Sequence, residues 1–149
     1  MRFMVMVYPG PKYEDEVKPT DGVSNDQLVA MGAFNEELVK AGVMLAGEGL
    51  HPPRKGFRVR FDGGKATVSD GPFAEAKEVV GGFWLWQVRS REEALAWAQR
   101  CPMGDDEMIE LRQVYESEDF ASDYPDAFTP DLLEAELKLR DELAQRQQA

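Results

Sequence analysis

The residues best suited to chemistry gather in one short stretch, Asp70-Gly71-Pro72-Phe73, with Lys77 close behind it. Asp70 could act as a general base or as a polar anchor for a ligand if the loop held its carboxylate in a cavity. Phe73 could contact an apolar group, and Lys77 an anionic one. Asp-Gly-Pro is also ordinary turn chemistry, and loop lysines are usually solvated, so a purely structural role stays open.

His51 is the only histidine of the chain, and it precedes Pro52-Pro53. Because histidine changes charge near neutral pH, His51 could serve as a second catalytic group beside Asp70. A solvent-exposed loop histidine is the alternative. The sequence has no phosphate-binding glycine motif and no His/Cys cluster, so we expect neither a nucleotide cofactor nor a metal. Cys101 stands alone in a predicted buried stripe, which argues against a disulfide and against a reactive nucleophile.

Aromatic and charged residues on the predicted strands are further candidates for ligand contacts. Tyr8, Trp84 and Trp86 could line a pocket, although large aromatic side chains more often form the core or a dimer interface. Arg112 could contact a ligand together with Glu110, two residues earlier on the same strand face. If that face is buried, the two charges need partners; an exposed sheet edge is the alternative.

Alternation and turn signals predict the elements that position these residues. A helix should begin at Ser24, which forms a capping box with Gln27, and end at Gly42. A second helix should begin at Ser90, in a capping box with Glu93, and bury Ala94, Leu95, Trp97, Ala98 and Cys101 before Pro102 ends it. We expect strands at Arg2 to Tyr8, Val43 to Leu50, Phe57 to Phe61, Ala66 to Ser69, Phe83 to Val88 and Met108 to Val114.

This order predicts an α+β fold of the ferredoxin-like βαββαβ type, with the pair around Gly63 as an inserted hairpin. Both central strands are apolar on both faces: Phe3, Val5 and Val7 oppose Met4, Met6 and Tyr8. Two helices cover one face of such a sheet. Since large apolar patches are rare on monomers, we expect a second copy to cover the other face, which gives a homodimer of the dimeric α/β barrel type.

Charge separates the tail from the rest of the chain. The net charge is −11, and residues 115–149 hold ten acidic residues against three basic ones. We expect a domain at residues 1–115 and an acidic extension at 116–149. Tyr115 to Phe128 should be irregular, and Thr129-Pro130 should begin a leucine-rich amphipathic helix. That helix could pack on its own domain or partner subunit, or recruit another protein.

Several function classes are disfavoured by composition. An acidic chain without a basic patch is a poor ligand for nucleic acid. No apolar run approaches the roughly 20 residues of a membrane span, and the first residues fit a strand better than a signal peptide. With its single cysteine, the chain suits a cytoplasmic location. We therefore expect a small-molecule ligand and self-association, with no nucleic-acid or membrane partner.

Several motifs together resemble the YCII-related proteins, in the branch called DGPF-domain proteins. They match in order and at natural spacing: Ala41-Gly42-Val43, Gly47-Glu48-Gly49-Leu50, Asp70 to Glu78, Gly81-Gly82-Phe83 and Ser90 to Ala94. The resemblance covers residues 1–115, with Ala76 where the family usually has Thr. It implies a ferredoxin-like fold that dimerises as a dimeric α/β barrel.

The resemblance implies less about activity. An Asp–His pair has been proposed as an active site in the wider family, one relative is a dehydrohalogenating enzyme, and some relatives are associated with sigma factors. Shorter members carry their histidine nearer the first helix, where this chain has none. Two hypotheses follow. The first is a pocket near the DGPF loop for a small apolar or aromatic metabolite, with proton-transfer or elimination chemistry of a cofactor-independent lyase or isomerase. The second is a non-catalytic regulatory or protein-interaction module linked to transcription.

Overall fold

The computed structural model describes residues 1–10, 24–73 and 78–148, and Lys77 lies outside this described part. The chain divides into two compact units, Met1–Gln113 and Val114–Ala149, which are described separately. The domain division expected after residue 115 stays a prediction. No helix among the described residues is both long and apolar enough to cross a bilayer.

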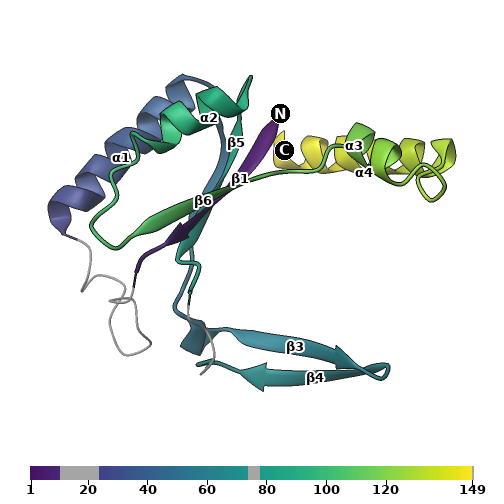
Figure 1. Ribbon diagram of the computed structural model, residues 1–149, viewed down its shortest axis with the longest axis horizontal. Coiled ribbons are helices and arrows are strands. Elements are labelled where there is room, and N and C mark those ends of the chain that lie inside the picture. Colours follow the sequence, from purple (N-terminus) through teal and green to yellow (C-terminus); the bar gives the residue numbers. More distant parts are fainter. Residues whose placement is uncertain (11–23, 74–77, 149) are drawn as a thin grey trace. The chain divides into compact units, whose positions relative to one another are not determined.

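The first unit has the ferredoxin-like topology (Figure 1). Its strands are β1 (Arg2–Tyr8), β2 (Met44–Gly49), β5 (Gly82–Gln87) and β6 (Met108–Gln113), and its helices are α1 (Asn25–Lys40) and α2 (Arg91–Ala98). The strands form one antiparallel sheet in the order β2-β5-β1-β6. A short helix, η1 (Pro53–Lys55), leads into a separate two-stranded sheet, β3 (Phe57–Asp62) and β4 (Lys65–Asp70). The predicted fold class and the inserted hairpin are confirmed.

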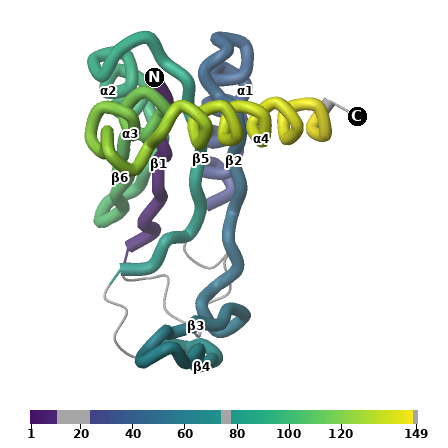
Figure 2. The backbone as a smooth tube through the Cα atoms, turned by 90° about the vertical axis from the view of Figure 1, so that its right-hand side faces the viewer, coloured from purple at the N-terminus to yellow at the C-terminus, as the bar shows by residue number. Residues whose placement is uncertain are grey.

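The alternation read in β1 and β5 is confirmed by burial. Phe3, Val5, Trp84 and Trp86 form the core on the face that α1 and α2 cover. The opposite, open face carries Met4, Met6, Tyr8, Phe83 and Leu85, none of which is fully buried in the single chain. Figure 2 shows α1 and the sheet as adjacent layers, with β5 between β1 and β2.

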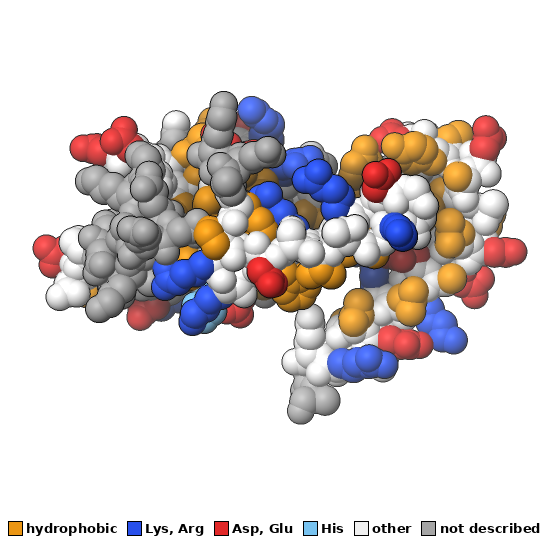
Figure 3. Space-filling view, turned by 90° about the horizontal axis from the view of Figure 1, so that it is seen from below, with side chains coloured by type: hydrophobic (Ala, Val, Ile, Leu, Met, Phe, Trp, Pro, Cys, Tyr) orange, Lys and Arg blue, Asp and Glu red, His pale blue; other side chains and the backbone are white. Residues whose placement is uncertain are grey.

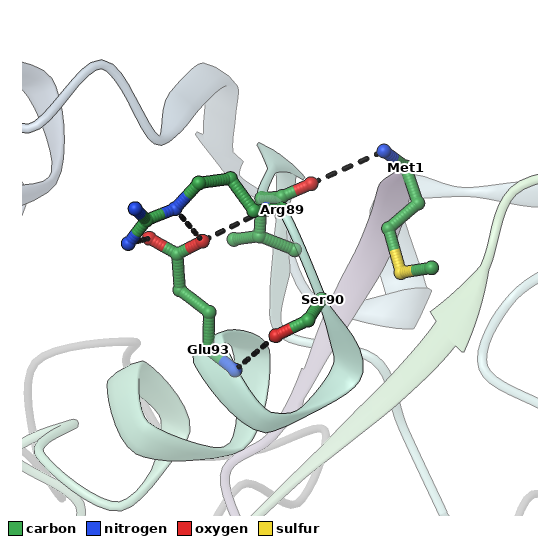
Figure 4. Close-up of polar contacts among 5 residues, drawn as sticks. Met1, Arg89, Ser90 and Glu93 are labelled. Carbon is green, nitrogen blue, oxygen red and sulfur yellow. Dashed lines mark hydrogen bonds and ion pairs between the residues drawn. The ribbon is translucent and has the colours of Figure 1, made fainter.

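Both predicted helix starts are confirmed, but the capping boxes are only half formed. The Ser24 hydroxyl accepts a hydrogen bond from the Gln27 N–H, and the Ser90 hydroxyl accepts one from the Glu93 N–H. The Gln27 side chain instead donates to Glu107, 80 residues away along the chain. The Glu93 carboxylate accepts from the backbone N–H and guanidinium of Arg89 (Figure 4). A tertiary partner thus engages the Gln27 side chain, whereas the Glu93 carboxylate binds Arg89, four residues earlier in the chain.

The prediction that Leu95 is buried is wrong, because its side chain is 49% exposed. Ala94, Trp97 and Ala98 are spaced three and four residues apart, so they share one face of α2. This face packs against the core. Leu95 lies about 100° around the helix from Ala94 and falls outside that stripe.

The second unit contains two helices, α3 (Ser117–Asp123) and α4 (Pro130–Gln148). The start of α4 at Pro130 is as predicted, and the Leu132 N–H donates to the Thr129 hydroxyl. The prediction that Tyr115 to Phe128 is irregular is wrong. At the start of α3, the Asp119 carboxylate accepts a hydrogen bond from the Glu116 N–H. The ring of Phe120 stacks on that of Phe128, with ring centroids 5.6 Å apart. Local capping and aromatic packing therefore stabilise a helix inside an acidic segment.

Candidate functional site

A pocket of about 430 Å³ lies between α1 and the sheet. Four elements, α1, β1, β2 and β5, line it together with their flanking loops. Helix α1 contributes Gln27, Leu28, Met31 and Asn35, and β2 with the residue after it contributes Met44 and Gly47 to Leu50. The other lining residues are Val7, Pro9, Gly81 to Trp84, Met103 and Glu107. A volume in this range suits a small metabolite, and apolar walls with a few polar atoms are typical of such sites.

Glycine in β2 makes room for the indole that forms one wall. A Cβ atom on Gly47 would lie 2.5 Å from Cδ1 of Trp84, closer than any side chain tolerates. The absence of a side chain at Gly47 therefore leaves room for the indole of Trp84 beside β2. Its ring also packs edge-on against Phe34, with ring centroids 6.2 Å apart. The wall is thus fixed by the core behind it.

Asn35 supplies a polar group close to Leu28 and Met31 on the pocket-lining face of α1. Its Oδ1 accepts a hydrogen bond of 2.9 Å from Nε1 of Trp84. An amide oxygen has two lone pairs, and this bond uses one of them. The second lone pair can accept a hydrogen bond from a ligand. Asn35 therefore holds the indole in place and presents a hydrogen-bonding group at the pocket wall.

The charged side chains that line the described pocket are both acidic, Glu48 and Glu107. The Glu107 carboxylate is held by a 2.8 Å hydrogen bond from Nε2 of Gln27 and by a hydrogen bond from the Gly104 N–H. A negatively charged ligand would be repelled here, whereas a hydrogen-bond donor would be attracted.

Among the predicted ligand contacts, Trp84 lines this pocket and Trp86 lies fully buried in the core. Nε1 of Trp86 is buried without a hydrogen-bond partner among the described residues. Ring centroids of the two tryptophans are 6.0 Å apart. Trp86 therefore supports the wall that Trp84 presents.

The DGPF turn lies against the segment that follows His51. A Cβ on Gly71 would fall 1.9 Å from the Pro53 carbonyl oxygen, so only glycine permits this approach. The Gly71 N–H also donates to the Gly56 carbonyl at 2.9 Å. The backbones that carry Asp70 and His51 thus meet, but neither residue lines the pocket of the described chain, and both are exposed. Phe73 is half-buried beneath the Arg58 guanidinium, 3.9 Å from its ring centroid.

Tyr8 and Arg112 lie on the open face of the sheet. The Tyr8 hydroxyl donates to a Glu110 carboxylate oxygen at 3.2 Å, and Nε of Arg112 lies 4.0 Å from the other oxygen. Loss of solvent around the phenol raises the pKa of Tyr8, and the negative charge of Glu110 raises it further. Arg112 is exposed on an edge strand, as one of the two sequence interpretations expects.

Sequence reasoning missed Gln27, Asn35 and Glu107. Asn35 gave a usable signal, because it continues the apolar stripe Leu28, Met31 and Leu38 at helical spacing. Gln27 and Glu107 gave none, since their pairing depends on contacts 80 residues apart. Burial raises the pKa of the Cys101 thiol to about 11, with a contribution from the charge of Glu107, so the thiol is neutral at physiological pH.

Comparison with known proteins identifies the family of the chain. The YCII-related domain family matches residues 1–118. The chain belongs to the YCII-related family. An uncharacterised protein of Rhizobium meliloti (strain 1021), R00369, is 34% identical over 97 residues, which cover 63% of this chain and 78% of that protein.

A solved structure similar to this YCII-related chain is the 5-chloro-2-hydroxyhydroquinone dehydrochlorinase of Burkholderia phenoliruptrix AC1100, in complex with 2,5-dihydroxybenzoquinone. The two are 16% identical with a TM-score of 0.42, and the match covers 79% of this chain and 98% of the other.

Proposed function

We propose that this YCII-related protein binds a small, uncharged, largely aromatic metabolite in the pocket between α1 and the sheet. The observation that carries the proposal is the pocket itself, about 430 Å³ in volume, with Trp84 and methionine side chains in its walls. Aromatic and thioether groups offer polarisable, apolar contacts to a planar ligand. The acceptors on Asn35, Glu48 and Glu107 favour a ligand that carries a hydroxyl or amine donor over a carboxylate.

Chemistry at this pocket would need an acid or base at the ligand. Asp70 and His51 remain the proposed pair, since Leu50, directly before His51, lines the pocket and the turn after Asp70 packs on Pro53. Proton transfer or elimination without a cofactor is the corresponding reaction class. The lone Cys101 supports a cytoplasmic location for it.

The binding proposal is tested with paired probes, simple phenols and the benzoic acids of the same size. Binding to the full chain is measured by ligand-observed NMR and thermal shift. We expect the phenols to bind at least tenfold more tightly, because the acids meet two carboxylates. Leu28→Trp should fill the pocket and abolish binding, whereas Val29→Trp, on an exposed neighbouring position, should leave it unchanged.

Equal binding of phenols to the wild type and Leu28→Trp would contradict the site. Tighter binding of the acids would contradict the ligand class. For the chemistry, Asp70→Asn should leave phenol binding intact and abolish turnover of a halogenated phenol, measured as halide release. Halide release at the wild-type rate would remove Asp70 from the reaction.

A second candidate function, a protein-interaction module, is supported by α4. Leu132, Leu137, Leu139 and Leu143 are each about half exposed on this helix. A chain shortened to residues 1–116 tests it. If α4 only recruits another protein, the shortened chain keeps the melting temperature, the oligomeric state and the phenol binding of the full chain. Loss of cooperative melting would show that α4 stabilises the fold instead.

A further inference from the structure

One carboxylate in the pocket between α1 and the sheet is anchored through a single oxygen. Glu107 directly precedes β6, is half-buried and lines this pocket. Its Oε2 atom accepts a hydrogen bond of 2.8 Å from Nε2 of Gln27 and a second one from the Gly104 N–H. Among the described residues, no donor binds the other oxygen, Oε1. The protein therefore holds one oxygen of Glu107 and leaves the other able to accept a hydrogen bond from a ligand.

The turn before β6 is shaped to hold this carboxylate. Asp106 has a φ of 65°, in the left-handed region that residues other than glycine rarely adopt. A Cβ atom on Gly10 would lie 2.7 Å from the Asp106 carbonyl oxygen, so the segment after β1 packs closely on the turn. A Cβ atom on Gly104 would lie 3.2 Å from Oε2 of Glu107, so glycine leaves room for the carboxylate itself. Backbone packing and hydrogen bonds together fix the position of Glu107.

The other carboxylate of the pocket, that of Glu48, is not held in this way. Glu48 is exposed, and its carboxylate forms no hydrogen bond or ion pair with another described residue. Exposed carboxylates are ordinary in a chain with 28 acidic residues, and Figure 3 shows several acidic side chains that project into solvent. A mobile side chain loses conformational freedom when it binds a ligand, whereas an anchored one has already lost it. Glu107 can therefore bind a donor at a lower entropic cost than Glu48.

We propose that Glu107 is the specificity-determining residue of this pocket, and that its Oε1 atom accepts the hydrogen bond of the ligand's hydroxyl or amine. This inference rests on the proposed function, because it concerns the ligand of the same pocket. A benzoate has no proton to donate at neutral pH and meets a charge of its own sign. A phenol supplies the donor that Oε1 lacks, and hydrogen bonds to a charged acceptor are the stronger ones. Selection between the two classes is thus assigned to one atom.

The test exchanges that acceptor for a donor. In Glu107→Gln, the amide oxygen is the only acceptor available to the donors of Gln27 and Gly104, so the NH₂ group takes the place of Oε1. The wild type should bind phenol about tenfold more tightly than benzoate. We expect the ratio of the benzoate to the phenol dissociation constant to fall by about tenfold or more in the variant, with weaker phenol and tighter benzoate binding. Ligand-observed NMR on the full chain measures both constants.

Two further variants separate this contact from the effect of charge alone. Asp105→Asn removes one negative charge from an exposed position on the same turn, outside the pocket lining, and should change the ratio by less than about twofold. Glu48→Gln removes the other carboxylate of the pocket and should change it by less than about threefold. Circular dichroism and melting temperature check that each variant is folded. An unchanged ratio in Glu107→Gln, or an equal change in Glu48→Gln, would overturn the inference.

A measurement on the wild type does not depend on any variant. Phenol is titrated into the full chain with ¹³C-labelled glutamate, and each carboxyl signal is assigned through bonds to its own backbone. We expect the carboxyl signal of Glu107 to move with phenol concentration and that of Glu48 to move less. Phenol binding without a shift of the Glu107 signal would overturn the inference.

The outcomes distinguish this inference from the proposed function. Phenol that binds the wild type but not Leu28→Trp supports the pocket, and the ratio in Glu107→Gln then decides the role of Glu107. If the pocket is supported and that ratio is unchanged, only the role of Glu107 is wrong. Phenol that fails to bind the wild type, or that binds Leu28→Trp equally well, would overturn the proposed function and this inference together.

Discussion

The two faces of the four-stranded sheet have nearly the same hydrophobicity but opposite fates in the single chain. On the covered face, Trp86 and Val5 are fully buried beneath the helices. On the open face, Met4 is 39% exposed and Tyr8 forms a hydrogen bond with Glu110. The covered face is completed by helices of the same unit, whereas no described element of Met1–Gln113 forms an equivalent layer on the open face. An apolar residue in this sheet therefore has an energetic role that depends on which side of the strand it occupies.

The covered face should show the largest effect of substitution. Trp86→Ala removes a fully buried indole and should lower the free energy of unfolding by about 3–5 kcal/mol. Met4→Ala, on the open face of the neighbouring strand, should lower the free energy of unfolding of the single chain much less. Urea unfolding followed by circular dichroism measures both.

Trp86→Phe separates packing from hydrogen bonding at this position. It keeps an aromatic ring and removes the Nε1 atom that is buried without a described partner, which should offset part of the lost volume. Equal losses for Trp86→Ala and Met4→Ala would show that the two faces do not differ as argued.

The open face should control self-association. We expect light scattering at micromolar concentration to give about twice the 16.8 kDa chain mass. Met6→Asp places a carboxylate among Met4, Phe83 and Leu85, so it should yield the mass of one chain with an unchanged circular dichroism spectrum. A wild-type protein that stays monomeric would contradict a dimer through this face.

The smallest expected effect concerns Tyr8. Because its pKa is raised in the folded chain, the folded state keeps the phenolic proton at a pH where the unfolded state loses it. The stabilisation is thus complete below the unfolded pKa of about 10 and is lost as pH rises through the folded pKa. Tyr8→Phe should remove this pH dependence and cost about 1 kcal/mol, the scale of one hydrogen bond.

The ultraviolet titration curve of Tyr8→Phe is subtracted from that of the wild type. The difference isolates the ionisation of the Tyr8 phenol from that of the other tyrosines. Burial of the open face against a second copy should raise its pKa further than in Met6→Asp. A Tyr8 phenol that titrates at the ordinary value in both proteins would indicate a solvated face.

Local features were predictable because neighbours in sequence decide them. The Ser24 and Ser90 caps, the positive φ of Gly42 after α1 and the two-sided pattern of β1 all follow from interactions over a few residues. The order of these elements was then sufficient for the ferredoxin-like topology. The DGPF motif and its accompanying glycines were sufficient for the family.

The pocket was decided by the tertiary structure. Its polar groups come from residues paired over long distances, Asn35 with Trp84 and Gln27 with Glu107, and a side chain chooses such a partner only once the helix has packed on the sheet. The same reason explains why the Gln27 side chain forms a hydrogen bond with Glu107 in place of the reciprocal half of its predicted capping box. Sequence alternation separated the two faces of each central strand, but only packing showed that Trp84 presents a pocket wall while Trp86, two residues later, is enclosed in the core.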